Sequence, residues 1–378
     1  MRITIVVGPF YPVPTVLGGA VEKVHLLLAQ AYRDAGHQVT IVSRRYKDFR
    51  HDEVTDGIRH IRIPSSDRSS NLAINLVLDF IYAVRVARAL PYSDLTISTA
   101  FSVPLLLPRR RAGKIYVQIG RHPKGQMFIY FRADRLQAVS KAVAQAIARQ
   151  APWLKSKICV IGYAIPDAFF ARRAGGRAEQ VVLYVGRIAR EKGIELLLRA
   201  FAQMRSRPDQ STMSAWRLRL VGPHAIAQGG DGPEYFQQLQ ELARELDIRC
   251  DFVAPIFEQN TLIGEYQRGS IFVYPSLAET GESFGLAPLE AMAAGCATIV
   301  SDLRCFDDYI VDGTNGLKFE HRAANPVENL ADKLIALIRD PKYLQRIAEA
   351  GRAAASQFSV ARIAERMMEE FNRVVDAG

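Results

Sequence analysis

Two glutamates in one stretch of the chain are of a residue type that suits the binding of a polyol. Glu282 lies in a polar loop that follows the β-type run 270–274, and Glu290 lies about two turns into a segment of helical composition. A loop between a strand and a helix N-terminus offers backbone N–H groups to phosphates and hydroxyls. Two carboxylates would repel a phosphate, but they accept hydrogen bonds from hydroxyl groups. A loop acid with a solvated helix acid is the alternative, but Glu290 interrupts an otherwise apolar segment, which favours a polyol site.

A second group consists of two cations after another predicted strand. The run 180–185 reads as a strand, Gly186, Arg187 and Lys192 follow it, and a helix is predicted from Ile194. Both cations and the helix N-terminus can face one anion, such as a phosphate group. Taken alone, an exposed basic loop is the alternative. With Glu282 and Glu290 downstream, a phosphate clamp is favoured.

Two loops in the first half of the chain are further candidates. Gly18 and Gly19 follow the predicted strand 3–7 in a βαβ unit, without the glycine fingerprint of nicotinamide or flavin enzymes. His122 lies in the loop after the predicted strand 114–119, where α/β proteins place ligand-binding residues. A plain structural turn and a structural histidine are the alternatives for these two loops.

The order of predicted elements indicates an α/β protein with two domains. The chain has 378 residues, too many for one ordinary core, and 49% of them are hydrophobic. Strands are predicted at 3–7, 38–43, 58–63, 95–98, 114–119 and 159–161, and then at 180–185, 217–221, 252–254, 270–274 and 298–301. Helices are predicted at 21–35, 71–90 and 361–375. Helix 71–90 either packs simply on the sheet or presents an amphipathic face.

The net positive charge of the chain arises from its first half. Residues 1–175 hold 26 Lys/Arg and 11 Asp/Glu, whereas residues 176–378 hold 23 and 28. This asymmetry favours an anionic acceptor or a membrane surface as partner, and no nucleic-acid-binding motif is present. The candidate contact residues, for which a solvated loop is the alternative, are Arg109, Arg110, Arg111, Arg121 and Lys124.

The cysteines and the apolar runs of the chain indicate where in the cell the protein is expected. The four cysteines are scattered without metal-ligand spacing, so they indicate reduced thiols. The N-terminal apolar run is too short for a signal peptide, and the run 72–90 contains Asp79, Arg85 and Arg88, so it should not span a bilayer. A cytoplasmic location is expected, with peripheral contact on the inner face of the membrane.

The two motifs resemble those of a known family. The stretch 282–293 resembles the Glu-x7-Glu motif of retaining, nucleotide-sugar-dependent glycosyltransferases of the GT-B fold, specifically glycosyltransferase family 4. The stretch 186–193 resembles the diphosphate clamp of that family, and the resemblance covers nearly the whole chain. It implies two Rossmann-like domains facing across a cleft: an acceptor-binding domain at 1–165, a linker at 166–179, a nucleotide-sugar-binding domain at 180–358, and a C-terminal helix at 359–378 that crosses back onto the first domain.

The resemblance also implies roles for individual residues. Arg187 and Lys192 would stabilise the departing diphosphate, Glu282 would bind sugar hydroxyls beside the anomeric carbon, and Glu290 would bind the ribose. His122 would lie near the donor sugar. Further donor contacts would come from Gly18, Gly19, Gly186, Ser283, Phe284, Gly285 and Leu286. No cofactor and no metal ion is expected, because the two cations neutralise the diphosphate.

The function implied is transfer of a hexosyl unit from a nucleotide sugar to a hydroxyl, with retention of the anomeric configuration. A sugar or a lipid-linked intermediate of cell-surface polysaccharide is the expected acceptor. Two alternatives stay open: a nucleotide-sugar 2-epimerase of the same fold, and a catalytically inactive, membrane-associated sugar-nucleotide-binding protein. The nucleotide, the sugar, the linkage and the oligomeric state do not follow from the sequence.

Overall fold

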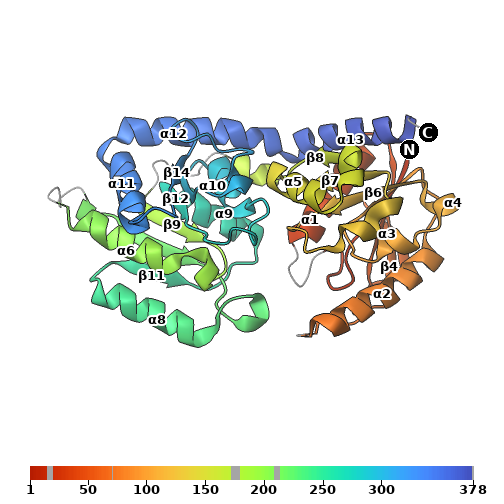
Figure 1. Ribbon diagram of the computed structural model, residues 1–378, viewed down its shortest axis with the longest axis horizontal. Coiled ribbons are helices and arrows are strands. Elements are labelled where there is room, and N and C mark those ends of the chain that lie inside the picture. The colour runs from red at the N-terminus through yellow and green to blue at the C-terminus, as the bar shows by residue number, and fades with distance from the viewer. Residues whose placement is uncertain (15–19, 70, 172–178, 208–212, 377–378) are drawn as a thin grey trace. The chain divides into compact units, whose positions relative to one another are not determined.

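The computed structural model consists of two compact α/β units (Figure 1). It describes residues 1–14, 20–69, 71–171, 179–207 and 213–376. Unit 1 comprises Met1–Pro166 together with Ser359–Gly378, and unit 2 comprises Asp167–Phe358. The N-terminal segment and the end of the chain therefore form one unit, and the middle of the chain forms the other.

Unit 1 is built on an eight-stranded sheet. Its strands lie in the order β3 (Asp52–Thr55), β4 (Ile58–Ile63), β2 (Gln38–Arg44), β1 (Arg2–Val6), β5 (Leu95–Ser98), β6 (Lys114–Ile119), β7 (Arg135–Ala138) and β8 (Ile158–Val160). All neighbours are parallel except β3, which pairs with β4 in a hairpin. The central strands are apolar runs buried along their length, as expected where helices cover both faces of a parallel sheet.

The helices of unit 1 are α1 (Ala20–Asp34), α2 (Leu72–Ala89), α3 (Val103–Leu106), α4 (Arg109–Ala112), α5 (Lys141–Gln150) and α13 (Val360–Asp376). Helix α13 closes the core of this unit, because the buried ring of Phe371 contacts Tyr32 at 5.5 Å and Tyr116 at 5.1 Å between centroids. Ile363 and Met367 are buried on the same helix face. The last helix of the chain thus belongs to the fold of its first 166 residues.

Unit 2 has a six-stranded, fully parallel sheet. Its strands lie in the order β11 (Cys250–Val253), β10 (Arg217–Val221), β9 (Val181–Val185), β12 (Ile271–Tyr274), β13 (Ala297–Ser301) and β14 (Leu317–Phe319). Counted from β9, this is the 3-2-1-4-5-6 order of the Rossmann fold. The direction of winding reverses between β9 and β12, and ligands bind at the carboxyl ends of the strands beside such a reversal.

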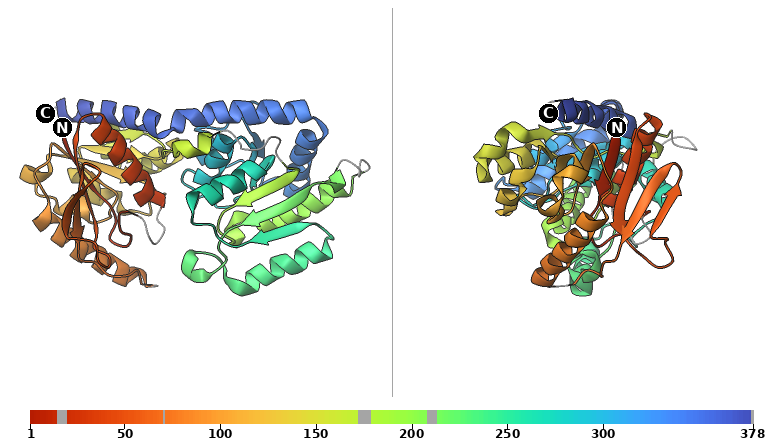
Figure 2. Two further views of the ribbon diagram at one scale, coloured as in Figure 1. Left: turned by 180° about the vertical axis from the view of Figure 1, so that it is seen from behind. Right: turned by 90° about the vertical axis from the view of Figure 1, so that its right-hand side faces the viewer.

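Helices cover both faces of this sheet (Figure 2). Helix α6 (Ile194–Arg205) contacts α8 (Gly232–Glu245) and α11 (Pro326–Arg339), whereas α10 (Leu286–Ala294) contacts α9 (Gln259–Arg268) and α12 (Pro341–Ala355). The structure thus confirms two Rossmann-like α/β units. It adds three short strands that the sequence did not predict, β3, β7 and β14.

Candidate functional site

The two predicted loops of unit 2 lie at the same edge of its sheet. Strands β9 and β12 are hydrogen-bonded neighbours, with Val182 opposite Ile271 and Leu183 opposite Phe272. Residues 186–193 follow the carboxyl end of β9, and residues 275–285 follow that of β12. The sheet order therefore brings Arg187, Lys192 and Glu282 to the reversal point.

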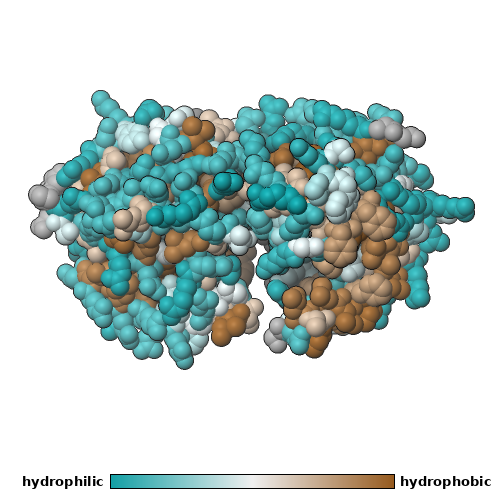
Figure 3. Space-filling model, in the orientation of Figure 1, coloured by the Kyte–Doolittle hydropathy of each residue, from teal (hydrophilic) through white to brown (hydrophobic). Residues whose placement is uncertain are grey.

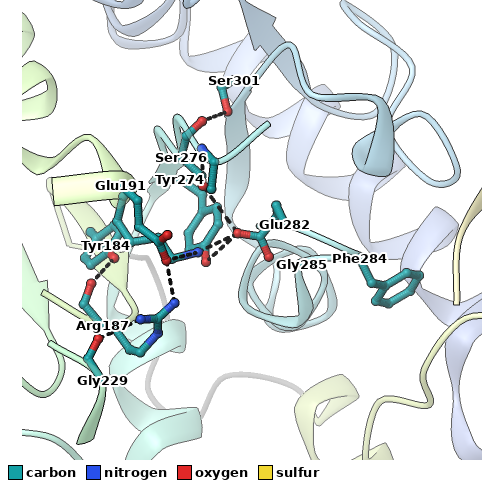
Figure 4. Close-up of polar contacts among 12 residues, drawn as sticks. Tyr184, Arg187, Glu191, Gly229, Tyr274, Ser276, Glu282, Phe284, Gly285 and Ser301 are labelled. Carbon is teal, nitrogen blue, oxygen red and sulfur yellow. Dashed lines mark hydrogen bonds and ion pairs between the residues drawn. The ribbon is translucent and has the colours of Figure 1, made fainter. Parts of the chain in front are cut away.

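Glu282 is held by three hydrogen bonds to one oxygen. Lys192 Nζ lies 2.6 Å from Glu282 Oε2, and the hydroxyls of Tyr274 and Ser276 donate to the same atom at 3.2 and 3.3 Å (Figure 4). The side chains of Lys192 and Glu282 are only 6% and 11% exposed. Among the described residues, none donates to Glu282 Oε1. This oxygen therefore keeps its capacity to accept a hydrogen bond from a ligand hydroxyl.

The surroundings of Lys192 and Ser276 reinforce this arrangement. Lys192 Nζ also lies over the ring of Tyr274, 5.3 Å from its centroid. Ser301 from β13 donates to the carbonyl oxygen of Ser276 at 2.6 Å and so fixes the start of the loop. Burial and the charge of Glu282 raise the pKa of Tyr274 well above its usual value, so this hydroxyl remains a donor.

Arg187 is more accessible than Lys192. Its Nη1 donates to Gly229 O and its Nη2 to Glu191 Oε1, both at 2.6 Å. The Arg187 and Glu191 side chains are 43% and 45% exposed, and such surface ion pairs contribute about 0–1 kcal/mol. Glu191 Oε1 also lies 4.0 Å from Lys192 Nζ. An anionic ligand can therefore displace Glu191 from Arg187 at little cost in stability.

Glycines allow the two loops to approach closely. Gly193 has φ +67°, and a Cβ at this position would lie 2.2 Å from Pro275 O of the second loop. Leu277 N donates to Glu191 O at 2.8 Å, which joins the loops directly. Gly285 has φ +78°, and its Cβ would lie 2.5 Å from Phe306 Cε1. Both positions require glycine for conformation and for space.

The predicted donor-binding backbone of residues 283–286 leads into α10, which begins at Leu286. Phe284 is buried against Tyr309 and Phe358, with centroids 5.4 and 5.8 Å apart, and its ring points away from Glu282 (Figure 4). The Tyr309 hydroxyl donates to the carbonyl oxygens of Phe284 and Gly285 at 3.0 and 2.8 Å. The backbone that precedes the helix is thereby fixed, while Ser283 is half-buried.

Glu290 lies on α10 and has its own partner. The buried hydroxyl of Tyr266, from α9, donates to Glu290 Oε2 at 2.9 Å. Burial and the charge of Glu290 raise the pKa of Tyr266 well above its usual value. The carboxylate is half-buried, and Tyr266 orients it just as Tyr274 orients Glu282.

In unit 1, the loop after β6 places His122 and Arg121. His122 is half-buried, and burial together with the charge of Arg149 lowers its pKa, so the ring is neutral near pH 7. Arg121 is exposed, and its charge acts on Glu22 of α1, a buried carboxylate whose pKa is raised by burial. Gly18 and Gly19 lie outside the described residues.

The predicted basic surface contains both exposed and engaged cations. Arg109 forms an ion pair with Asp134 and donates to Arg132 O at 2.7 Å, and Arg111 donates to Arg88 O at 3.1 Å. Arg110 and Lys124 are exposed. Part of the arginine cluster thus helps to hold unit 1 together.

Sequence reasoning missed several partners in these loops. The missed residues, which share the task of holding a predicted residue in place, are Glu22, Glu191, Tyr266, Tyr274 and Ser276. Only Glu191 carried a usable signal, because it follows Arg187 by four residues and opposite charges at this spacing pair on a helical turn.

The chain is similar in sequence to known glycosyl transferases. Residues 169–354 match the family model of glycosyl transferases group 1. The chain is 29% identical over 198 residues to a lipopolysaccharide 1,2-N-acetylglucosaminetransferase of Salmonella typhimurium, a match that covers 52% of this chain and 49% of the relative. It is 30% identical over 263 residues to a D-inositol 3-phosphate glycosyltransferase of Nocardia farcinica, covering 66% and 54%.

Solved structures match over the full length. The sucrose-phosphate synthase of Thermosynechococcus elongatus has a TM-score of 0.76 at 22% identity and covers 100% of both chains. HepE of Anabaena, solved in complex with UDP and glucose, has a TM-score of 0.73 at 17% identity and covers 99% of this chain and 100% of its own.

Together these results confirm the GT-B fold. The match to the model of glycosyl transferases group 1 covers the part of the chain that carries Arg187, Lys192, Glu282 and Glu290. The chain spans about half the length of the curated relatives it matches. No helix among the described residues has both the length and the apolarity needed to cross a bilayer.

Proposed function

We propose that the chain is a retaining glycosyltransferase that moves a hexosyl unit from a nucleotide sugar to a hydroxyl acceptor. One observation carries the proposal: Lys192, Tyr274 and Ser276 hold Glu282 beside Arg187 at the reversal point of the unit 2 sheet. An oriented carboxylate for sugar hydroxyls and cations for a diphosphate are the two requirements of a nucleotide-sugar site. The group 1 match over the same residues supports it.

In the proposed reaction, the bond between the anomeric carbon and the diphosphate oxygen breaks while the acceptor oxygen bonds to that carbon from the same face. The acceptor proton passes to the departing phosphate. Arg187 and Lys192 neutralise the charge that develops on the diphosphate, so the reaction needs no metal ion. Glu282 Oε1 accepts from sugar hydroxyls beside the anomeric carbon, and Glu290 accepts from the ribose. We also assign His122 a contact with the donor sugar.

The proposed acceptor is a lipid-linked or cell-surface polysaccharide intermediate, with the enzyme at the inner face of the membrane. Two facts support this choice: the basic composition of residues 1–175, and the likeness to a lipopolysaccharide N-acetylglucosaminetransferase. A 2-epimerase of the same fold would turn over the donor without an acceptor. An inactive binding protein would bind the nucleotide without any turnover.

The first experiment is a thermal-shift panel with UDP, GDP, dTDP and ADP, each with Mg²⁺ and with EDTA. A nucleotide at 100 times its dissociation constant should stabilise the protein by about 2.7 kcal/mol. Arg187→Ala removes charge-assisted hydrogen bonds worth about 1.5–3 kcal/mol, so it should weaken binding by roughly 10- to 100-fold. Arg190→Ala is the matched control, because this neighbouring arginine is directed at Glu195 and Gln238.

The expected result is one nucleotide that binds equally with and without Mg²⁺, and that loses affinity in Arg187→Ala but not in Arg190→Ala. Absence of a shift with all four nucleotides would contradict the proposal. Once the donor is known, the anomeric configuration of the product, read by NMR, tests retention: an inverted product would rule out the proposed reaction course.

A further inference from the structure

Helix α2 of unit 1 exposes apolar side chains and buries a carboxylate. Six apolar side chains of this helix are 40–73% exposed: Leu72, Ile74, Leu76, Val77, Phe80 and Ile81. By contrast, its Asp79 is buried and accepts a hydrogen bond from Ser102 N at 2.7 Å. Asn75 turns to the backbone of Ser69, which it contacts twice at 2.8 Å. A surface helix of a globular protein ordinarily shows the opposite pattern.

The exposure of these apolar side chains does not result from poor packing of α2 on its own unit. Tyr82, Ala83 and Val86 are fully buried beneath the helix, and the Tyr82 hydroxyl donates to Val7 O at 3.2 Å. The inner side of α2 is therefore a normal contact with the sheet. The six exposed side chains form a second apolar side, which we call the outer face of α2.

The apolar surface continues beyond α2. Helix α2 contacts α3, and α3 contacts the 3-10 segment Gln126–Arg132. Arg132 donates to Leu105 O at 2.6 Å and to Leu107 O at 3.1 Å, which ties that segment to the end of α3. Phe128 and Phe131 of the segment are 63% and 57% exposed. Figure 3 shows apolar side chains gathered over the α2 and α3 side of unit 1.

Cations accompany this surface. Arg85 and Arg88, in the last turns of α2, are exposed. Arg111 of α4 donates to Arg88 O at 3.1 Å and lies 5.9 Å from the ring centroid of Tyr92, which is also exposed. Residues 101–166 contain 12 Lys/Arg but a single acidic residue, Asp134, and that residue is paired with Arg109. An apolar face bordered by unmatched positive charge is complementary to an anionic lipid surface.

We propose that the outer face of α2 docks on an anionic phospholipid bilayer. The helix lies in the plane of the interface, its apolar side chains enter the boundary of the acyl chains, and the arginines contact headgroup phosphates. A second copy of the chain fits less well, because a symmetric interface pairs a patch with itself and would bring the arginines together. The inference extends the membrane part of the proposed function, since docking would bring unit 1 to a lipid-linked acceptor.

The test is sedimentation with vesicles of phosphatidylcholine, with and without phosphatidylglycerol, at low and high salt. The full chain should bind only the anionic vesicles, and more weakly at high salt. Val77→Asp/Ile81→Asp places two charges in the outer face and should weaken binding by roughly 100-fold. Val54→Asp/Val311→Asp is the matched control, because both valines are exposed elsewhere and the change in charge is the same. Val77→Ser/Ile81→Ser repeats the test without adding charge.

A nucleotide thermal shift on the same variants separates this inference from the proposed function. Intact shifts in Val77→Asp/Ile81→Asp, with lost vesicle binding, support docking. Vesicle binding without any nucleotide shift would support docking and contradict the glycosyltransferase proposal. Docking would be overturned by three results: no binding to anionic vesicles, equal binding of the α2 variants and the control, or a dimer of the wild type that Val77→Asp/Ile81→Asp dissociates.

Discussion

The Lys192–Glu282 pair should stabilise unit 2 as well as form its site, and removal of the lysine alone tests this. The side chains are 6% and 11% exposed, and Nζ lies 2.6 Å from Oε2. Removal of one partner of a buried pair costs about 3–5 kcal/mol, since the other charge is left uncompensated. Glu282 would keep the hydroxyls of Tyr274 and Ser276, so we expect Lys192→Met to cost about 3 kcal/mol, at the lower end of that range.

Glu282→Gln in the same background should recover much of this loss, because no buried charge then remains. We expect a coupling energy of about 2 kcal/mol between the two sites, within the range found for contacting residues. Urea unfolding followed by tryptophan fluorescence measures it. The chain has two tryptophans, and Trp153→Phe removes the exposed one in unit 1 and leaves the buried Trp216 as a reporter of unit 2.

The control is the exposed pair Arg190–Glu195, with side chains 58% and 45% exposed. Glu195→Gln should change the free energy of unfolding by less than about 1 kcal/mol. Two results would contradict a coupling between Lys192 and Glu282: a cost of Lys192→Met no larger than that of the control, or simple addition of the effects of Lys192→Met and Glu282→Gln. Either result would mean that the two charges do not depend on each other in the folded protein.

Two further predictions concern a glycine and a buried histidine. Gly285→Ala should destabilise unit 2 by at least about 1 kcal/mol more than Gly313→Ala, as measured by urea unfolding. The two residues have similar φ, but only the first would place a Cβ 2.5 Å from Phe306 Cε1. Burial lowers the pKa of His25 to about 4, although Gln118 opposes the shift. Between pH 6.5 and pH 4 the unfolded chain binds a proton at His25 that the folded protein does not bind. The free energy of unfolding therefore decreases as pH falls through this range, by about 2 kcal/mol at pH 5. His25→Gln should flatten this dependence in thermal melts of unit 1, and an unchanged slope would refute it.

Much of the fold could be predicted, because buried parallel strands correspond to runs of the sequence that are rich in apolar residues. Strands β4, β5, β6 and β10 have the predicted bounds. The missed strands β3, β7 and β14 have three or four residues, and β7 alternates polar Arg135 and Gln137 with apolar neighbours. Three or four residues are too few for an alternating pattern to be distinguished from chance, and the place of such a strand in a sheet is set by the adjacent strand.

The site was predictable in part for a related reason. Arg187, Lys192 and Glu282 are polar residues in glycine-containing loops after strands, a local pattern. No comparable pattern indicates the role of Tyr274. This residue is the last of an apolar strand, so in the sequence it resembles a core residue. Its hydroxyl reaches Glu282 only because the loop after β12 turns back over the strand end. A hydrogen-bond partner that depends on the path of a loop cannot be predicted from the spacing of residues in the sequence.

The different burial of the two cations assigns them different parts in donor binding. Without a ligand each cation has a carboxylate, Lys192 with Glu282 and Arg187 with Glu191, so the site holds no excess positive charge for a diphosphate. Separation of Lys192 from Glu282 would leave the buried Glu282 carboxylate without a counter-charge. Separation of Arg187 from Glu191 breaks an ion pair whose side chains are nearly half-exposed, which costs little. We therefore expect Arg187 to leave Glu191 for the diphosphate. Lys192 should keep its contact with Glu282 and donate to the diphosphate with another N–H of its ammonium group.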